Sequence, residues 1–434
     1  MQQRSRWQSI LIWVGFIIIL PIPLLWLLNQ HMVDTAAHIQ AADEGLLAYS
    51  WWLGATILAS RPRWLVSRLN IKTVYQVHGV LGVFALLAAT IHRQTEFSFQ
   101  PAIKLTGNIA WWLTIIGAIL AIIFLSGWLT DRWPGLARFK NWLSHHGLRH
   151  QLIMWLHRLN LICIALIWLH VNFIPQVSSV RPFMLVFDIY TIVTILIYVG
   201  SKVLPFSRRQ QAVVHSNQQL NDSTRLFVID LQQAQTVHVG ATFFLRFPGI
   251  HGLREPHPFS LISAKQQDGK QELKFIIRQN GDDTKRLDQV ETGARVRVEG
   301  PFGDLDQTAQ QAIQQGHPLV LYGMGTGIAP LIGISQKFAG HGTIHVLWSY
   351  SREADHFLNV DNQFQDLTDN KDFQYSPLQG RMNPKRWQEQ LSDSEIENGE
   401  FIIIGGSAAI LQVETQLQRI GVKGRQLHDE RLTM

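Results

Sequence analysis

The first half of the chain contains six apolar stretches whose lengths approach or exceed what a lipid bilayer requires. About 30 Å of hydrocarbon needs roughly 20 helical residues, each rising about 1.5 Å. The stretches are residues 7–28, 46–60, 73–92, 108–130, 151–172 and 183–204, of which 46–60 is the shortest. We therefore expect a six-helix transmembrane bundle. The first stretch is too long for a cleaved signal peptide, and no small-residue cleavage site follows it.

Composition separates this apolar half from the rest of the chain. Thirteen of the 15 Trp lie before residue 170, and the excess of positive charge lies before residue 211. The net charge of +6 therefore does not indicate nucleic acid binding, because the basic residues belong to the apolar half and its loops. Cys163 is the only cysteine among 434 residues, which excludes intrachain disulfides and cysteine-ligated metal clusters.

The basic residues of the loops are distributed unevenly, and this predicts an orientation. The loops on one side of the predicted bundle contain few basic residues: Lys104 and Arg181, with Arg93 at the end of a stretch. The other side holds Arg4, Arg6, Arg61, Arg63, Arg68, Lys72, Arg132, Arg138, Lys140 and Arg149. Because cytoplasmic loops are enriched in Lys and Arg, we expect an integral protein of the cell membrane with both termini and the second half in the cytoplasm.

Four histidines lie inside the third and fifth stretches. His78 and His92 are 14 positions apart, which gives about 21 Å of rise and leaves them on one helix face. His157 and His170 are 13 positions apart, and an ideal helix would separate their directions by about 140°. We expect a distorted helix if both face the same partner. The two helices run in the same direction, so His78 is expected level with His157, and His92 level with His170.

Two facing imidazoles at each of two depths are what two b-type haems require, with one histidine from each helix on either side of the iron. Iron ligated in this way has no vacant position and serves outer-sphere electron transfer. The alternative is that the four are buried histidines in hydrogen bonds between helices. Polar groups in hydrocarbon are costly, and four at matched depths favour the haem interpretation. The predicted metal ligands are thus His78, His92, His157 and His170.

The second half has the pattern of a sheet-rich protein. Strand-like runs at residues 225–231, 243–247, 258–263, 273–279 and 294–299 are separated by turns, which favours a small antiparallel β-barrel. From His317 onward, apolar runs at 318–323, 343–350 and 401–406 alternate with helical stretches. This alternation predicts an α/β fold with a parallel sheet.

A glycine-rich segment, GMGTG at residues 323–327, follows the first strand of this parallel sheet. Glycines at the start of a helix let a phosphate group approach the free backbone N–H groups closely. The segment therefore indicates nucleotide binding, and an ordinary tight turn is the alternative.

In its order of parts, the chain resembles a ferric reductase-type transmembrane protein fused to a ferredoxin-NADP reductase-like module. The superfamily includes NADPH oxidases and ferric reductases, and the resemblance covers nearly the whole chain. The histidine spacings of 14 and 13 are those of the family's third and fifth helices. The resemblance implies a transmembrane haem domain at 1–206, an FAD-binding β-barrel domain at 207–304 and an NAD(P)H-binding α/β domain at 305–434.

Several motifs match this family position by position. The resemblance implies that His257, Pro258, Phe259 and Ser260 bind flavin, with the aromatic ring on the isoalloxazine and the Ser hydroxyl at its reactive edge. It also implies two further sets of binding residues. These are Arg278, Gly281 and Thr284 for the FAD diphosphate, and Gly323, Gly325, Thr326, Gly327, Pro330 and Gly405 for the nicotinamide nucleotide.

Two arginines bear on the choice of nucleotide. The resemblance places Arg352 and Arg381, the latter in Gly380-Arg381, near the adenosine 2′-phosphate. A guanidinium can bind phosphate in a bidentate way, which favours NADPH over NADH, and ordinary surface arginines are the alternative. The chain departs from the family in two places. Gly405-Gly406-Ser407 stands where Cys-Gly-Pro is common, and the C-terminus HDERLTM has no terminal aromatic residue.

The resemblance implies an NAD(P)H-dependent transmembrane oxidoreductase. NADPH would reduce FAD in the cytoplasm, and electrons would pass through the His78–His157 haem and then the His92–His170 haem to an acceptor on the outer side. We favour a ferric chelate as this acceptor, with reduction of oxygen to superoxide as the alternative. A non-enzymatic alternative is a haem-binding membrane subunit for sensing or docking. The sequence specifies no protein partner.

Overall fold

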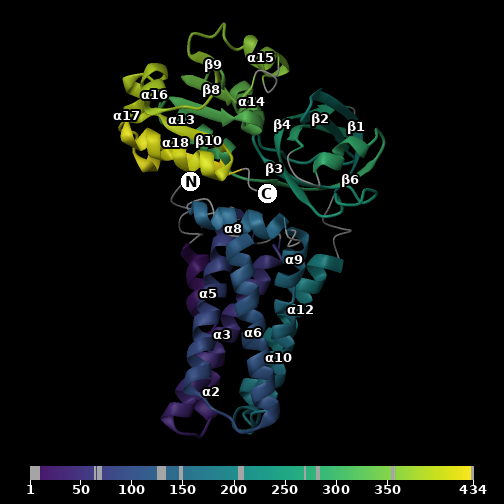
Figure 1. The fold of residues 1–434 in the computed structure, drawn as a ribbon, viewed down its shortest axis with the longest axis vertical. Coiled ribbons are helices and arrows are strands. Elements are labelled where there is room, and N and C mark those ends of the chain that lie inside the picture. The colour runs from purple at the N-terminus through teal and green to yellow at the C-terminus, as the bar shows by residue number, and fades with distance from the viewer. Residues whose placement is uncertain are drawn as a thin grey trace. The chain divides into compact units, whose positions relative to one another are not determined.

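The computed structural model of the chain describes residues 10–62, 65, 71–124, 133–145, 150–203, 210–267, 270–279, 284–352, 356 and 358–431. The chain forms two compact units, Met1–Phe206 and Ser207–Met434. The first is built from helices, and the second contains two sheets with helices (Figure 1).

The helical unit carries most of the apolar residues. Its elements are η1 (Gly15–Ile19), α2 (Ile22–His31), α3 (Ala36–Ala59), α5 (Ile71–Thr95), α6 (Pro101–Phe124), α8 (Pro134–His145), α9 (His150–Arg158), α10 (Asn160–Asn172), α11 (Pro175–Ser178) and α12 (Arg181–Val203). Within the described residues, five segments are long and apolar enough to cross a membrane: Ile10–His31, Thr73–Thr95, Pro101–Phe124, Leu152–Asn172 and Arg181–Ser201. They correspond to five of the six predicted stretches.

The remaining predicted stretch, 46–60, lies within α3, which begins at Ala36 and has 24 residues. Its first half contains Gln40, Asp43 and Glu44, so α3 is not among the five most apolar segments. Its second half is buried: Tyr49 is 1% exposed, and its hydroxyl lies 2.9 Å from Oγ1 of Thr191 on α12. The second half of α3 therefore packs against neighbouring helices, although its first half is polar.

The fifth predicted stretch is interrupted between its two histidines. α9 ends at Arg158 and α10 begins at Asn160, with Leu159 in a turn. The N–H of Leu159 donates to the carbonyl of Leu156, and the N–H of Ile162 donates to that of Leu159. These tighter bonds across three residues change the helical phase. The expected distortion is therefore present.

The second unit begins with six strands, β1 (Gln210–Asn221), β2 (Thr224–Leu231), β3 (Thr242–Arg246), β4 (His257–Gln267), β5 (Lys270–Arg278) and β6 (Arg295–Phe302), with the short helix η2 (Thr284–Gln289) before β6. They pair in the order β1-β2-β5-β4-β3-β6 and close into a barrel. Alternate side chains point inward, and Phe227, Phe243 and Phe275 fill the interior. The sequence did not predict β1, because its Gln and Asn residues interrupt any apolar run.

Five parallel strands follow in the order β11-β10-β7-β8-β9. They are β7 (Leu319–Met324), β8 (Ile344–Tyr350), β9 (Phe373–Gln379), β10 (Glu400–Gly405) and β11 (Leu427–Arg431). The accompanying helices are α13 (Leu305–Gln314), η3 (Gly325–Ile328), α14 (Ala329–Phe338), α15 (Leu358–Gln365), α16 (Pro384–Gln390), α17 (Asp393–Asn398), α18 (Ser407–Arg419) and η5 (Gly424–Gln426). The sequence did not predict β11 either, because its polar residues form no apolar run.

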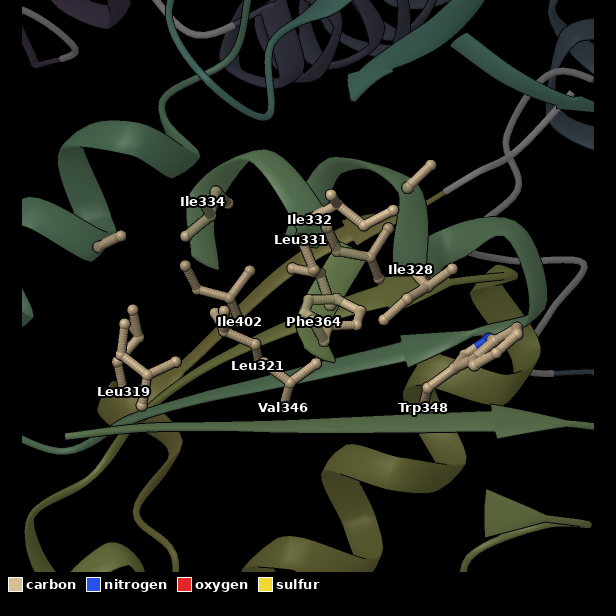
Figure 2. Packing of buried hydrophobic residues seen from close by; sticks show 14 of the residues in the cluster. Leu319, Leu321, Ile328, Leu331, Ile332, Ile334, Val346, Trp348, Phe364 and Ile402 are labelled. Carbon is tan, nitrogen blue, oxygen red and sulfur yellow. The ribbon is translucent and has the colours of Figure 1, made fainter. Parts of the chain in front are cut away.

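The core of the parallel sheet fixes the position of α14. Figure 2 shows Leu331 and Ile332 of this helix facing Leu321, Val346 and Ile402 of three strands. All five side chains are at most 1% exposed. Burial of this apolar surface holds the start of α14, and the glycine segment before it, at the carboxyl end of β7.

The barrel and the parallel sheet meet at α14. A side chain at Gly333 would collide with the main-chain oxygen of Ile262 in β4, so the helix backbone lies directly against this strand. Gly240, with a φ of +70°, lies against Ile334 of the same helix. The segment expected to bind flavin on β4 and the segment expected to bind nucleotide before α14 are therefore held within one unit.

Candidate functional site

The structure brings the four histidines of the helical unit together in two pairs. The ring centres of His78 on α5 and His157 on α9 are 6.0 Å apart, with an angle of 75° between the ring planes. Those of His92 on α5 and His170 on α10 are 6.2 Å apart, with an angle of 85°. The pairs combine the residues that the spacing along each helix predicts to lie at equal depth.

Three of the four imidazoles bind a main-chain oxygen through Nδ1. His78 lies 2.9 Å from the oxygen of Ala55, His92 2.7 Å from that of Ala41, and His170 2.9 Å from that of Ile103. A carbonyl accepts only from a protonated nitrogen, so these contacts place the proton on Nδ1. Within the described residues, Nε2 of these rings has no hydrogen-bond partner, and its lone pair is free to ligate a metal.

The dimensions of both pairs fit an iron between two imidazoles. A metal–imidazole bond is about 2 Å long and each ring centre lies about 1 Å beyond its nitrogen, so two collinear ligands have ring centres roughly 6 Å apart. A direct hydrogen bond between His92 and His170 would need a proton on one Nε2, and that neutral ring would then lack the proton with which its Nδ1 donates to the backbone. The donor set and the spacing are those that bis-histidine haem requires.

The helix break supports the His78–His157 pair. Asn160, the first residue of α10, places Nδ2 of its side chain 3.4 Å from Nδ1 of His157. Its buried Oδ1 has no partner among the described residues. Gly117 of α6 gives this amide room, because a Cβ there would lie 2.8 Å from it, and the indole of Trp52 donates to the main-chain oxygen of Asn160 at 3.3 Å. Sequence reasoning missed all three of these neighbours.

The predicted flavin motif forms the start of β4. The rings of His257 and Phe259 lie on the same side of the strand, with centres 6.4 Å apart and an angle of 30°. Phe259 is 8% exposed and belongs to the barrel core, so its ring offers little accessible surface. Pro258 and Ser260 lie on the other side of the strand, where Ser260 pairs with Thr242 of β3.

The second flavin segment approaches the nucleotide segment. Arg278 ends β5, and a Cβ built on Gly325 would lie 3.7 Å from Nη1 of its guanidinium. Thr284 begins η2 and is 1% exposed. Gly281 lies outside the described residues. Arg278 thus lies between the end of β5 and the glycine segment.

The glycine segment is shaped by close backbone contacts. Gly325 has a φ of +57°, which favours glycine. A Cβ on Gly323 would lie 2.8 Å from the backbone of Ile328, and one on Gly327 would collide with the main-chain oxygen of Ile404 in β10. The segment therefore turns tightly into α14, whose first turn contains Pro330. Thr326 lies at the bend, in η3.

Two neighbours complete this edge of the sheet. Trp348 of β8 is fully buried, and its indole N–H donates to the main-chain oxygen of Gly325 at 2.9 Å. Gly405 ends β10, and a Cβ there would come 2.7 Å from the Met324 methyl group. The bond from Trp348 to Gly325 could not be predicted from the sequence, because it depends on the pairing of β7 with β8.

The two arginines expected near the adenosine phosphate follow adjacent strands. Arg352 comes just after β8, and Arg381 just after β9, whose parallel pairing places both at the carboxyl edge of the sheet. Both are exposed. Arg386 of α16 was not predicted. Its Nη1 donates to the main-chain oxygens of Gln379 and Arg381, both at 3.1 Å, which holds the turn that carries Arg381.

A partly buried carboxyl group bonds to the strand partner of Ser260. The hydroxyl of Thr242, the strand partner of Ser260, donates to Oε1 of Glu430 on β11 at 2.6 Å. Burial raises the pKa of Glu430 to about 7, with the charges of Asp304 and Asp429 acting in the same direction. Sequence reasoning missed this residue, because 188 positions separate it from Thr242.

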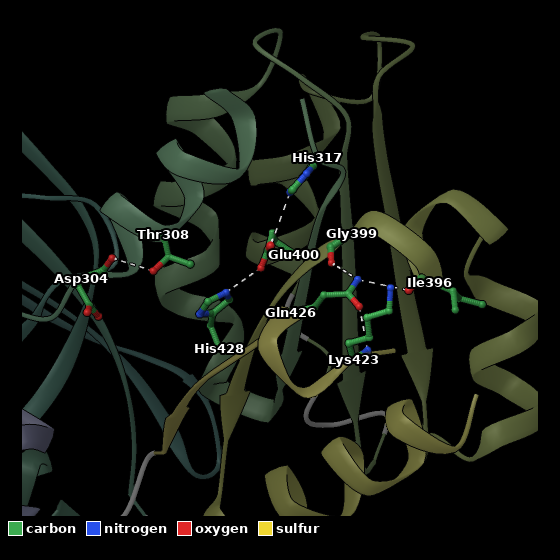
Figure 3. Close-up of polar contacts among 9 residues, drawn as sticks. All are labelled: Asp304, Thr308, His317, Ile396, Gly399, Glu400, Lys423, Gln426 and His428. Carbon is green, nitrogen blue, oxygen red and sulfur yellow. Dashed lines mark hydrogen bonds and ion pairs between the residues drawn. The ribbon is translucent and has the colours of Figure 1, made fainter. Parts of the chain in front are cut away.

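Polar contacts fasten β11 to the rest of the sheet. Figure 3 shows His428 of β11 bonded to Glu400 of β10, at 2.8 Å, with His317 on the other side of this carboxylate at 3.6 Å. Nearby, the side chain of Gln426 donates to the main-chain oxygens of Gly399 and Ile396. These contacts fix the strand that carries Glu430.

Comparison with known proteins identifies the class of the second unit. The oxidoreductase FAD-binding domain family matches residues 211–306, which include the predicted flavin motif. The chain therefore contains an FAD-binding oxidoreductase domain, and this prediction is confirmed. The match also covers the barrel strands that the structure places around that motif.

The chain is similar to NADPH oxidase 1 of Mus musculus, with 31% identity over 171 residues, which are 38% of this chain and 26% of that protein. It is also similar to dual oxidase 2 of Rattus norvegicus, with 30% identity over 204 residues, which are 44% of this chain and 12% of that protein. The resemblance to the NADPH oxidase superfamily is thus confirmed. The chain spans only about a quarter or less of these relatives.

Solved structures also align with about half of the chain. A cytochrome P450 reductase of Amycolatopsis shares 21% identity with a TM-score of 0.45, over 52% of this chain and 70% of that one. The FAD/NAD-binding domain of nitric oxide dioxygenase from Vibrio cholerae shares 20% identity with a TM-score of 0.43, over 51% of this chain and 98% of that one.

Proposed function

We propose that this chain is an NAD(P)H-dependent membrane oxidoreductase that carries electrons through FAD and two haems to an acceptor on the outer side. The observation that carries the proposal is the pairing of His78 with His157 and of His92 with His170, at the separation that iron requires. The FAD-binding family match supports the point of electron entry. We assign haem, FAD and NAD(P)H binding to 1–206, 207–304 and 305–434.

We further propose six membrane-spanning helices with both termini in the cytoplasm. The sixth is α3, whose 24 residues are sufficient for a span. Its carboxylates are satisfied within the bundle, since Asp43 accepts from Asn29 at 2.7 Å and Glu44 accepts from Thr95 at 2.6 Å. The basic loops support the orientation.

When bound, FAD accepts a hydride from the nicotinamide and the haems transfer single electrons. The residues of this chain bind and orient these groups. The imidazoles would hold the two haems at two depths, which the 14-residue spacing of His78 and His92 on α5 sets. Arg278 and the N–H groups at the start of α14 bind phosphate oxygens, and Ser260 presents its hydroxyl to the flavin.

The preferred nucleotide is NADPH, with NADH as a weaker substrate. The support is that Arg352 and Arg381 follow parallel neighbouring strands at the same edge of the sheet, where two guanidinium groups would bind a 2′-phosphate. Arg386 limits the freedom of the second arginine by binding its main chain.

For the acceptor, we propose first a ferric chelate, which takes one electron at a time from an iron that has no open position. Reduction of oxygen to superoxide is the second candidate, and the similarity to NADPH oxidase 1 and dual oxidase 2 favours it. A non-enzymatic sensor or docking subunit is the third.

Stopped-flow spectroscopy of the detergent-solubilised chain separates these candidates. NADPH is added without oxygen, and we expect flavin bleaching followed by haem reduction. Ferric citrate or oxygen is then added, and the one that rapidly reoxidises the haem is the acceptor. A protein that binds both cofactors but reduces neither with NADPH or NADH contradicts the proposed activity and supports the sensor.

A further inference from the structure

Both imidazoles of the His92–His170 pair lie on the backbone of a neighbouring helix at a glycine. His92 meets α3 at Gly45, where a Cβ would lie 3.3 Å from Cε1 of the ring. His170 meets α6 at Gly107, where a Cβ would lie 3.0 Å from Cε1. Each ring therefore occupies space that any other residue at position 45 or 107 would fill.

The two contacts share a spacing. The oxygen that binds His92 belongs to Ala41, four positions before Gly45, and the oxygen that binds His170 belongs to Ile103, four positions before Gly107. In an α-helix the Cα–Cβ bond tilts toward the N-terminus, so a side chain covers the turn that precedes it. Glycine four positions later thus exposes the oxygen to the imidazole.

The other pair is built differently. His78 binds the oxygen of Ala55, and the residue four positions later is Ala59, which has a side chain. His157 lies beside the Asn160 amide at the helix break. His157 also contacts the backbone of a glycine, Gly117 of α6. The arrangement in which a glycine follows the bonded oxygen by four positions is found, among these four histidines, at the His92–His170 pair.

We propose that Gly45 and Gly107 are positioning residues for the haem at the His92–His170 pair, an inference that rests on the proposed function. By admitting each ring to the helix backbone, they keep Nδ1–H bonded to the main chain and Nε2 directed at the iron. This bond makes the imidazole a more basic ligand, which favours ferric iron and lowers its reduction potential. A Cβ moves the ring outward by a few tenths of an ångström and weakens both effects.

The test uses the full chain in detergent, with FAD content as the measure of folded protein. Gly45→Ala and Gly107→Ala are compared with Gly79→Ala, which adjoins His78 but is exposed and has open space around its Cβ. Haem per FAD, low-temperature absorption and a redox titration are measured for each variant.

We expect one of the two low-spin haem components to move to a higher potential or to be lost in both variants, with its affinity falling about 10-fold or more. The other component remains as in the wild type. Gly107→Ala has the larger effect, because its Cβ would be closer to the ring, and Gly79→Ala leaves both components unchanged.

Two results overturn the inference: both components unchanged in Gly45→Ala and Gly107→Ala, or both lost together. If Gly107→Ala does not accumulate, Gly45→Ala decides by the same criteria, because its contact is looser. Failure of the proposed function is a different observation. In that case the wild-type chain contains FAD but no low-spin haem.

Discussion

The helical unit and the sheet-rich unit position their functional groups in opposite ways. In the helical unit, imidazole side chains come to the backbone and bind the oxygens of Ala41, Ala55 and Ile103. In the sheet-rich unit, Gly323 and Gly327 carry no side chain, so the backbone there can lie directly against neighbouring backbone. The first unit should therefore be sensitive to loss of an imidazole as well as to a side chain gained at Gly45 or Gly107, and the second mainly to gain of a side chain.

The largest expected effect is loss of an imidazole. His92→Ala and His78→Ala should each remove one haem component and lower electron transfer to the acceptor more than about 100-fold, because the chain of carriers is broken. Haem content per FAD and acceptor reduction rates measure this. His92→Met, which keeps an axial ligand, should retain haem at a higher potential. Full activity in either alanine variant would show that the histidine pairs are not needed for electron transfer.

The converse change in the other unit is Gly327→Ala. The added methyl group meets the oxygen of Ile404, so we expect destabilisation by about 1–3 kcal/mol and weaker NADPH binding. Gly406→Ala is the matched control, because its Cβ has open space. Thermal release of flavin fluorescence reports stability. Equal behaviour of the two variants would show that close backbone contact is unimportant here.

Arg381→Ala tests a side chain within the backbone-dominated unit. Loss of a charge-assisted contact with the 2′-phosphate should raise the KM for NADPH about 10-fold or more, with little change for NADH. Steady-state flavin reduction with both nucleotides measures the ratio, and Lys385→Ala, at an exposed position of α16, serves as the control. An equal loss with both nucleotides would place Arg381 away from the phosphate.

The effect of Glu430 is confined to stability and depends on pH. Its pKa of about 7 in the folded chain exceeds the ordinary value of 4.5, so the folded state favours the protonated form. Its stabilising contribution is complete below pH 4.5 and is lost as the pH rises through 7, by on the order of 3 kcal/mol at most.

Glu430→Gln should flatten this dependence, because the amide stays neutral. The measurement is the midpoint of thermal unfolding across this pH range, followed by flavin fluorescence. An identical pH dependence in the variant and the wild type would show that this carboxyl group titrates normally.

The sequence predicted features that depend on periodicity. The 14-residue spacing placed His78 and His92 on one face, and the 13-residue spacing required the distortion now seen at Leu159. It did not predict the start of α3, because Asp43 and Glu44 make its first half polar although they remain helical.

The sequence did not predict contacts between segments that are far apart in the chain. Periodicity shows which face of a helix is buried but not which neighbour covers it, so Gly45 and Gly107 carried no signal. The bond between Trp348 and Gly325 depends on strand order, and the bond between Thr242 and Glu430 depends on how two sheets meet. Position-by-position resemblance found the residues expected to touch ligands, but not Trp348, Arg386 or Asn160, which support them.

We propose above that paired imidazoles hold two haems within the helical unit. The most direct measurement is the absorption spectrum of the purified chain, with haem counted per FAD, beside a variant in which His78, His92, His157 and His170 are all replaced by Ala. We expect a low-spin b-type spectrum in the wild type that disappears in the variant while FAD remains. A wild-type chain without this spectrum, or a variant that keeps it, would contradict haem binding by these four histidines.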